Sequence, residues 1–164
     1  MSKCQKLNNL SRQLPKPNEW PKLFEDLKAQ SDRGAALIAG SLVDAATRLA
    51  LQCKMIEMTD EDAGSLFEQP NAPLGTFSAR IKVGRALGIY GPLLEKKLNK
   101  IRNIRNQFAH ALVPIDFGNE LVAKECESFP LAMMPKWPLP NDWSGTRIRY
   151  VTACFAATDY LVGR

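Results

Sequence analysis

The feature that most constrains the fold is the segment DRGAALIAGSLVDAATRLALQCK, which is apolar or small on nearly every side of a helix. Ser31 or Asp32 can cap its start. A helix without a broad polar face must be covered by neighbours, so we expect it at the centre of a bundle. Its most apolar part, residues 34–43, falls well short of the roughly 20 residues that span a bilayer, so no membrane interaction is expected. Close approach of neighbouring helices is favoured by small residues at Ala35, Ala36, Ala39, Gly40, Ala45 and Ala46.

Helical periodicity extends over most of the remaining chain. Apolar residues recur at spacings of three and four in segments 19–30, 76–87, 92–112 and 146–162, with a short helix near 120–128 and a helical turn after residue 58. We find no window in which apolar and polar residues alternate as in a strand. The sequence therefore predicts an all-α, single-domain bundle of about five to seven helices over residues 19–164, preceded by an extended lead over residues 1–18.

Composition and charge exclude several classes of protein. The 164 residues are 45% apolar and 24% charged, which is typical of a globular domain. The net charge of +5 comes from scattered basic residues, so any basic surface must be assembled by folding. The N-terminal segment lacks the apolar stretch of a signal peptide, and we expect a cytoplasmic protein. The four cysteines are too widely spaced to predict a zinc site or a redox motif; they are Cys4, Cys53, Cys126 and Cys154. We therefore expect no metal and no cofactor.

The helix predicted over residues 92–112 carries the only histidine of the chain. At about 100° per residue, a core face lies within about 60° of Ile101, whereas Arg102, Asn106 and His110 lie on a polar stripe. Arg105 lies at about 40°, on the flank of the core face, where its guanidinium needs an acceptor. The core face consists of Leu94, Leu98, Ile101, Ile104, Phe108 and Leu112.

Two interpretations of this helix remain open. In the structural one, Arg105 pairs with Asp32 or Asp44, and His110 is a helix-terminal residue favoured by the helix dipole. In the functional one, Arg105, Asn106 and His110 bind a phosphodiester, the arginine neutralises transition-state charge, and the histidine transfers a proton without a metal. A second proton-transfer group would then have to come from another protomer, so this interpretation predicts a homodimer.

Arg80, Arg102 and several other residues are candidates for binding or support. Asp32 and Arg33 open the central helix, where an acid favours the dipole, and Asp32 is also a candidate to orient His110 or Arg105. Asp44 shares a stripe with Arg33 and can form an i,i+4 pair with Arg48. Ser78 and the amides beside it are placed to cap a helix or to receive a phosphate at its N-terminus.

The proline-rich segment 130–145 contains two tryptophans. Trp137 and Trp143 are expected to cover the bundle, because their neighbours are apolar too; the alternative is that they stack on bases.

Three stretches, DRGAALIAGSLVDAATRLA, LFEQPNAPLGTFSARIKVGRALGIY and IRNIRNQFAH, together resemble the mannitol operon repressor (MtlR) family of small helical bacterial proteins. The resemblance covers about residues 30–112. RNQFAH also resembles the R-x4-6-H motif of the HEPN superfamily, many members of which are metal-independent endoribonucleases, whereas others bind nucleotides or proteins. This second resemblance implies an HEPN-like fold and assigns the arginine, polar partner and histidine of the motif to Arg105, Asn106 and His110.

Direct reading of DNA is not expected, because the chain shows neither a helix-turn-helix pattern nor a basic arm. The nearest candidate is segment 76–87, where we expect Arg80, Lys82 and Arg85 to form a solvated face. The leading functional hypothesis is therefore a mannitol-repressor-like cytosolic regulator of transcription that binds a protein or RNA partner. The alternative is a metal-independent HEPN-type endoribonuclease.

Overall fold

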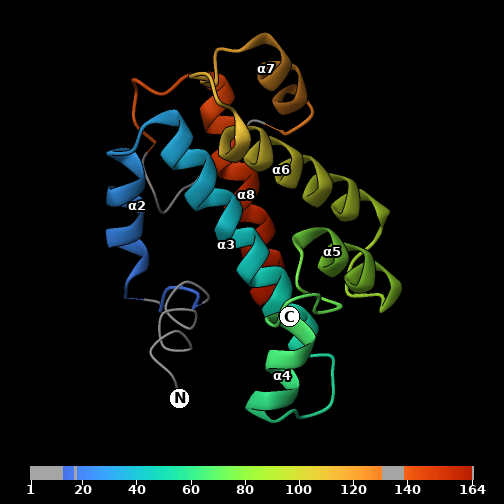
Figure 1. The fold of residues 1–164 in the computed structure, drawn as a ribbon. Coiled ribbons are helices and arrows are strands. Elements are labelled where there is room, and N and C mark those ends of the chain that lie inside the picture. Colours follow the sequence, from blue (N-terminus) through green and yellow to red (C-terminus); the bar gives the residue numbers. More distant parts are fainter. Residues whose placement is uncertain (1–12, 17, 131–138, 164) are drawn as a thin grey trace.

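The computed structural model describes residues 13–16, 18–130 and 139–163. All regular elements in these ranges are helical, which confirms the predicted all-α, single-domain bundle (Figure 1). Most of the predicted N-terminal lead, residues 1–12 and 17, lies outside the described residues. The described part contains seven helices: α2 (Trp20–Lys28), α3 (Asp32–Gln52), α4 (Asp60–Phe67), α5 (Phe77–Ala86), α6 (Pro92–His110), α7 (Glu120–Glu127) and α8 (Gly145–Val162).

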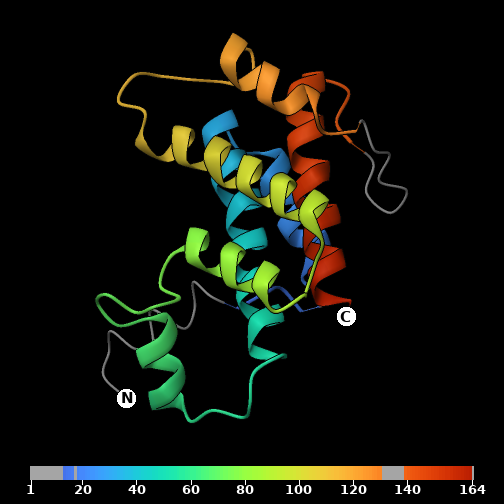
Figure 2. The ribbon, with the colours of Figure 1, turned by 90° about the vertical axis from the view of Figure 1, so that its right-hand side faces the viewer.

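Helix α3 is the central helix, as its composition predicts. It packs against α2, α5, α6 and α8, and the two views of the ribbon place α2 on one side of the α3/α8 pair with α5 and α6 on the other (Figures 1 and 2). Ser31 caps the helix by accepting a hydrogen bond from the Gly34 amide at 3.2 Å. By length and apolar composition α3 could also cross a membrane, but 56% of its most apolar window is buried inside the bundle.

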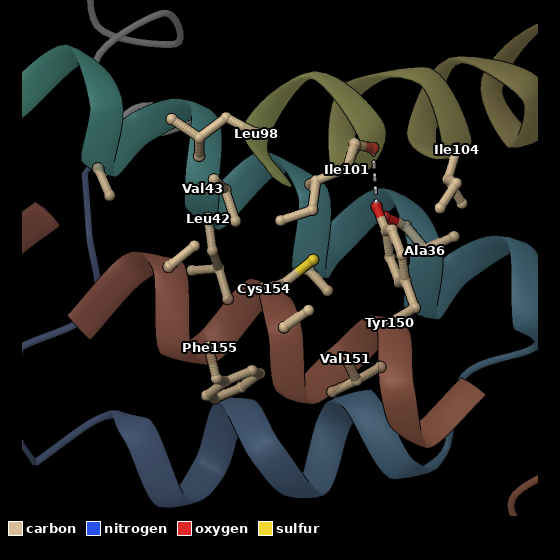
Figure 3. Packing of buried hydrophobic residues seen from close by; sticks show 14 of the residues in the cluster. Ala36, Leu42, Val43, Leu98, Ile101, Ile104, Tyr150, Val151, Cys154 and Phe155 are labelled. Carbon is tan, nitrogen blue, oxygen red and sulfur yellow. Dashed lines mark hydrogen bonds between the residues drawn. The ribbon is translucent and has the colours of Figure 1, made fainter. Parts of the chain in front are cut away.

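The core joins three long helices around Tyr150 (Figure 3). The phenol of this α8 residue donates to the carbonyl oxygen of Ala36 in α3 at 3.2 Å and lies 3.4 Å from that of Ile101 in α6. Burial raises the pKa of Tyr150 well above its ordinary value, so the hydroxyl remains a donor. Cys126 and Cys154 are buried free thiols nearby, whereas Cys53 is exposed.

Helix α6 ends two residues earlier than the sequence predicts. Leu98, Ile101, Ile104 and Phe108 are buried as expected. Ala111 has an extended backbone with ψ of 122°, so the helix stops at His110. Leu112 then lies beyond the helix and is fully exposed, and the prediction that it faces the core is wrong.

Trp143 is buried against Phe24 of α2, with the two ring centroids 6.4 Å apart. The guanidinium of Arg147 lies 4.2 Å from the Trp143 ring centroid. Trp143 therefore packs in the fold as expected, whereas Trp137 lies outside the described residues.

Candidate functional site

Helices α3, α5 and α6 surround a cleft of about 490 Å³. Helix α5 lies beside α6 with its N-terminal end toward the C-terminal half of α6 (Figure 2), and this arrangement brings residues 75–78 to the wall of the cleft. Seven of the nine candidate residues from the sequence line it: Asp44, Ser78, Arg80, Arg102, Arg105, Asn106 and His110.

The α6 residues share one wall because they are spaced by three and four positions, close to one helical turn. Arg105 is partly buried, and its Nη1 donates to the Oδ1 of Asn106 at 3.0 Å. His110 is the last residue of the helix, and it is exposed at the mouth of the cleft. The wall therefore combines two guanidinium groups, an amide and an imidazole.

Asp44 of α3 is the carboxylate at the base of this arrangement. Its oxygens lie 3.1 Å from Nη2 of Arg80 and 3.5 Å from Nη2 of Arg105. Burial raises the pKa of Asp44 above its ordinary value of 3.8, and the positive charges of Arg80, Arg105 and Arg48 oppose that rise. The structure thus contains the Arg105–Asp44 pair of the structural interpretation and extends it to a second arginine.

Two expectations about neighbouring arginines are wrong. Arg48 bonds to Glu68 at 2.7 Å, because helix α4 brings this acid within reach, and it does not form the expected close pair with Asp44. Arg80 was expected on a solvated face, yet its side chain is only 12% exposed because it turns inward to Asp44 and to the Gly75 carbonyl. Arg85 is more exposed and lies 3.6 Å from Glu95.

The N-terminus of α5 forms the opposite wall. Thr76 is its N-cap, and its hydroxyl accepts from the Ala79 amide at 3.1 Å. Ser78 is therefore inside the first turn and is not the capping residue. The first amides of a helix have no intrahelical acceptor and favour anions, so this end adds to the positive field of the arginines.

Asp32 and Arg33 do not reach the cleft. Asp32 accepts from the Phe117 amide at 2.9 Å and from Arg147 at 3.0 Å, so the hypothesis that it orients His110 or Arg105 is wrong. It lies twelve residues before Asp44, which is about 18 Å along a helix. Arg33 donates to the carbonyls of Ala111 and Val113 at 2.8 and 3.3 Å. It thereby caps the end of α6.

Sequence reasoning missed two contributors. Thr76 has the signature of an N-cap, a threonine three residues before the amide it binds, and that signal was available. The inward turn of Arg80 depends on Asp44, which lies 36 residues away, and no local pattern predicts it.

The arrangement can bind an anion. Three guanidinium groups, one carboxylate and a helix N-terminus line the cleft, and guanidinium groups match the geometry of phosphate oxygens. Within the described ranges, no group of three or more His, Cys, Asp or Glu side chains is placed to hold a metal ion. The chain matches no protein-family model, no curated protein sequence and no solved structure.

Proposed function

We propose that the cleft binds a phosphodiester of RNA and that the protein is a metal-independent endoribonuclease. One observation carries the proposal: the imidazole of His110 lines the same cleft as Arg80, Arg102 and Arg105. Cleavage of this kind needs cationic donors for the charge that develops on phosphorus and a group that exchanges protons near neutral pH. Arginine and histidine are the side chains suited to these two tasks.

In the proposed reaction, the 2′-hydroxyl of the substrate attacks the adjacent phosphorus. The 2′-O–P bond forms, the P–O5′ bond breaks, and the products are a 2′,3′-cyclic phosphate and a free 5′-hydroxyl. Arg105 and Arg102 stabilise the phosphorane-like charge, and Asn106 positions Arg105 through its hydrogen bond. His110 transfers one proton, and His110 of a second protomer transfers the other, since the chain contains a single histidine.

The test is incubation of mixed structured RNAs with the purified protein in EDTA, read on a denaturing gel. Wild type should cleave, and His110→Ala should not, because it lacks the proton-transfer group. Arg105→Lys should cleave far more slowly, because an ammonium group cannot make the bidentate contact. Melting curves of the variants verify that each is folded. Equal cleavage by wild type and His110→Ala would refute the proposal.

A second candidate is a regulatory protein of the mannitol-repressor type that acts through a partner. The observation in its favour is an apolar pair that follows α6, Leu112 and Val113. The side chain of Leu112 is fully exposed, and that of Val113 is 67% exposed. Exposed apolar side chains placed together are typical of protein-binding surfaces. This candidate predicts that substitutions at the pair abolish regulation while His110→Ala leaves it intact.

A further inference from the structure

A second groove adjoins the cleft across helix α6. It has a volume of about 670 Å³ and lies between α6, α7 and the connection that joins them. Asn106 lines both the cleft and the groove, so the two adjoin at this side chain. The floor and walls include the apolar side chains of Ile104, Ile115 and Val122.

The polar lining of the groove includes four carboxamides, and the side-chain oxygen atoms of the three asparagines among them are already engaged. Oδ1 of Asn103 accepts from Arg102 at 2.9 Å, and Oδ1 of Asn106 accepts from Arg105 at 3.0 Å. Oδ1 of Asn119 accepts from the first amides of α7 at 3.1 and 3.4 Å. These contacts fix the orientation of each amide, so each side chain presents its NH₂ group as a donor.

The same groove contains one carboxylate, Glu125 of α7. Its Oε2 lies 3.6 Å from the Lys100 ammonium, and its side chain is 52% exposed. An ion pair this long and exposed is weak, so the carboxylate can accept from a ligand. The groove therefore offers several donors, one bidentate acceptor and apolar walls, which is the usual make-up of a small-molecule site.

We propose that this groove binds the base of the nucleotide whose phosphate occupies the cleft, and that it selects guanine; the inference rests on the proposed function. Guanine presents two acceptors, O6 and N7, to the amide NH₂ groups. Its N1–H and exocyclic amino group form a pair of adjacent donors that a carboxylate accepts together. Uracil has a single N–H donor on its pairing edge, and adenine has an amino group without an adjacent ring N–H. Each of these bases therefore donates fewer hydrogen bonds to the Glu125 carboxylate than guanine does. The apolar side chains contact the faces of the base.

The test measures dissociation constants of the 3′-monophosphates of guanosine, adenosine, uridine and cytidine, and of inorganic phosphate. Guanosine 3′-monophosphate should bind wild type about tenfold more tightly than the other three, since one bidentate contact discriminates by roughly this factor or more. Glu125→Gln should remove that preference and leave the affinity for inorganic phosphate unchanged. Glu127→Gln, an exposed acid on α7 outside the groove, is the matched control and should keep the preference.

The two proposals fail in different ways. Equal affinity for the four nucleotides, with binding weakened in Arg105→Lys, would overturn guanine selection and leave the phosphate cleft in place. A guanosine preference that persists in Glu125→Gln would overturn the role of the groove. Failure of both inorganic phosphate and the nucleotides to bind would overturn the proposed function and the inference together.

Discussion

Asp44 is the residue on which the charge balance of the cleft depends. Its carboxylate is 16% exposed and lies within 3.5 Å of two guanidinium groups. Without Asp44, Arg80 and Arg105 would face each other uncompensated in a partly buried site, which is costly. The acid therefore holds both cations in place, and an incoming phosphate contacts arginines that are already oriented.

The raised pKa of Asp44 gives a testable pH dependence. Because burial raises the folded-state pKa above the unfolded value of 3.8, the folded protein binds more protons than the unfolded chain between these two values. The stabilisation that comes from proton binding to Asp44 in the folded state is therefore fully present below pH 3.8 and is lost as the pH rises through the folded-state pKa. Asp44→Asn cannot titrate and should lack this loss.

Denaturant unfolding of wild type and Asp44→Asn from about pH 3.5 to 7 measures the effect. The free energy of unfolding of wild type should decline relative to that of the variant as the pH rises. A difference that stays constant, or that grows in favour of wild type, would contradict the assigned direction.

Among the elements, the crossing of α3, α6 and α8 controls the position of Arg105. A Cβ atom at Gly40 would lie 2.8 Å from Cγ of Arg105 and 2.9 Å from the hydroxyl oxygen of Tyr150. Both distances are shorter than normal contacts, and Tyr150 is fully buried, so the helices cannot absorb the methyl group cheaply. Gly40 thus permits the close approach that brings Arg105 to Asp44.

Gly40→Ala should lower the free energy of unfolding. Overpacking costs about 1–3 kcal/mol, whereas replacing glycine in a helix gains only about 0.5–1 kcal/mol. The variant should also bind inorganic phosphate more weakly, because Arg105 is displaced. Gly64→Ala in α4 is the matched control: a Cβ there meets nothing within 4 Å, so stability should rise slightly. Equal unfolding energies for the two variants would show that the crossing tolerates the methyl group.

The helices were predictable because their apolar periodicity is local. The end of α6 was not predictable, because Arg33, 78 residues away in the sequence, donates a hydrogen bond to the carbonyl oxygen of Ala111 there. In the site, spacing alone placed Arg102, Asn106 and His110 on one stripe. Two other contacts were not predictable, because no local sequence pattern encodes contacts between distant residues. They are the ion pair of Arg80 with Asp44 and the ion pair of Asp32 with Arg147.

At the scale of the whole molecule, the proposed reaction needs two histidines and therefore two copies of the chain. Leu112 and Val113 lie two and three residues after His110, so a second copy docked on this apolar pair brings the two His110 side chains toward each other. We expect a homodimer by sedimentation equilibrium, and Leu112→Lys should convert it to a monomer. Leu93→Lys, at the far end of α6 and 82% exposed, should leave the mass unchanged. A monomeric wild type would contradict the two-protomer mechanism.

The central claim is that RNA phosphate binds beside His110, and the single histidine of the chain allows it to be tested directly. The measurement is a titration of the imidazole NMR signals with a 2′-O-methyl RNA oligonucleotide, which cannot be cleaved because its 2′-oxygen is blocked. We predict that the signals shift to saturation and return when inorganic phosphate or salt displaces the RNA. If the RNA binds, as seen by fluorescence anisotropy, while the imidazole signals stay unchanged, RNA contacts another surface and the account is wrong.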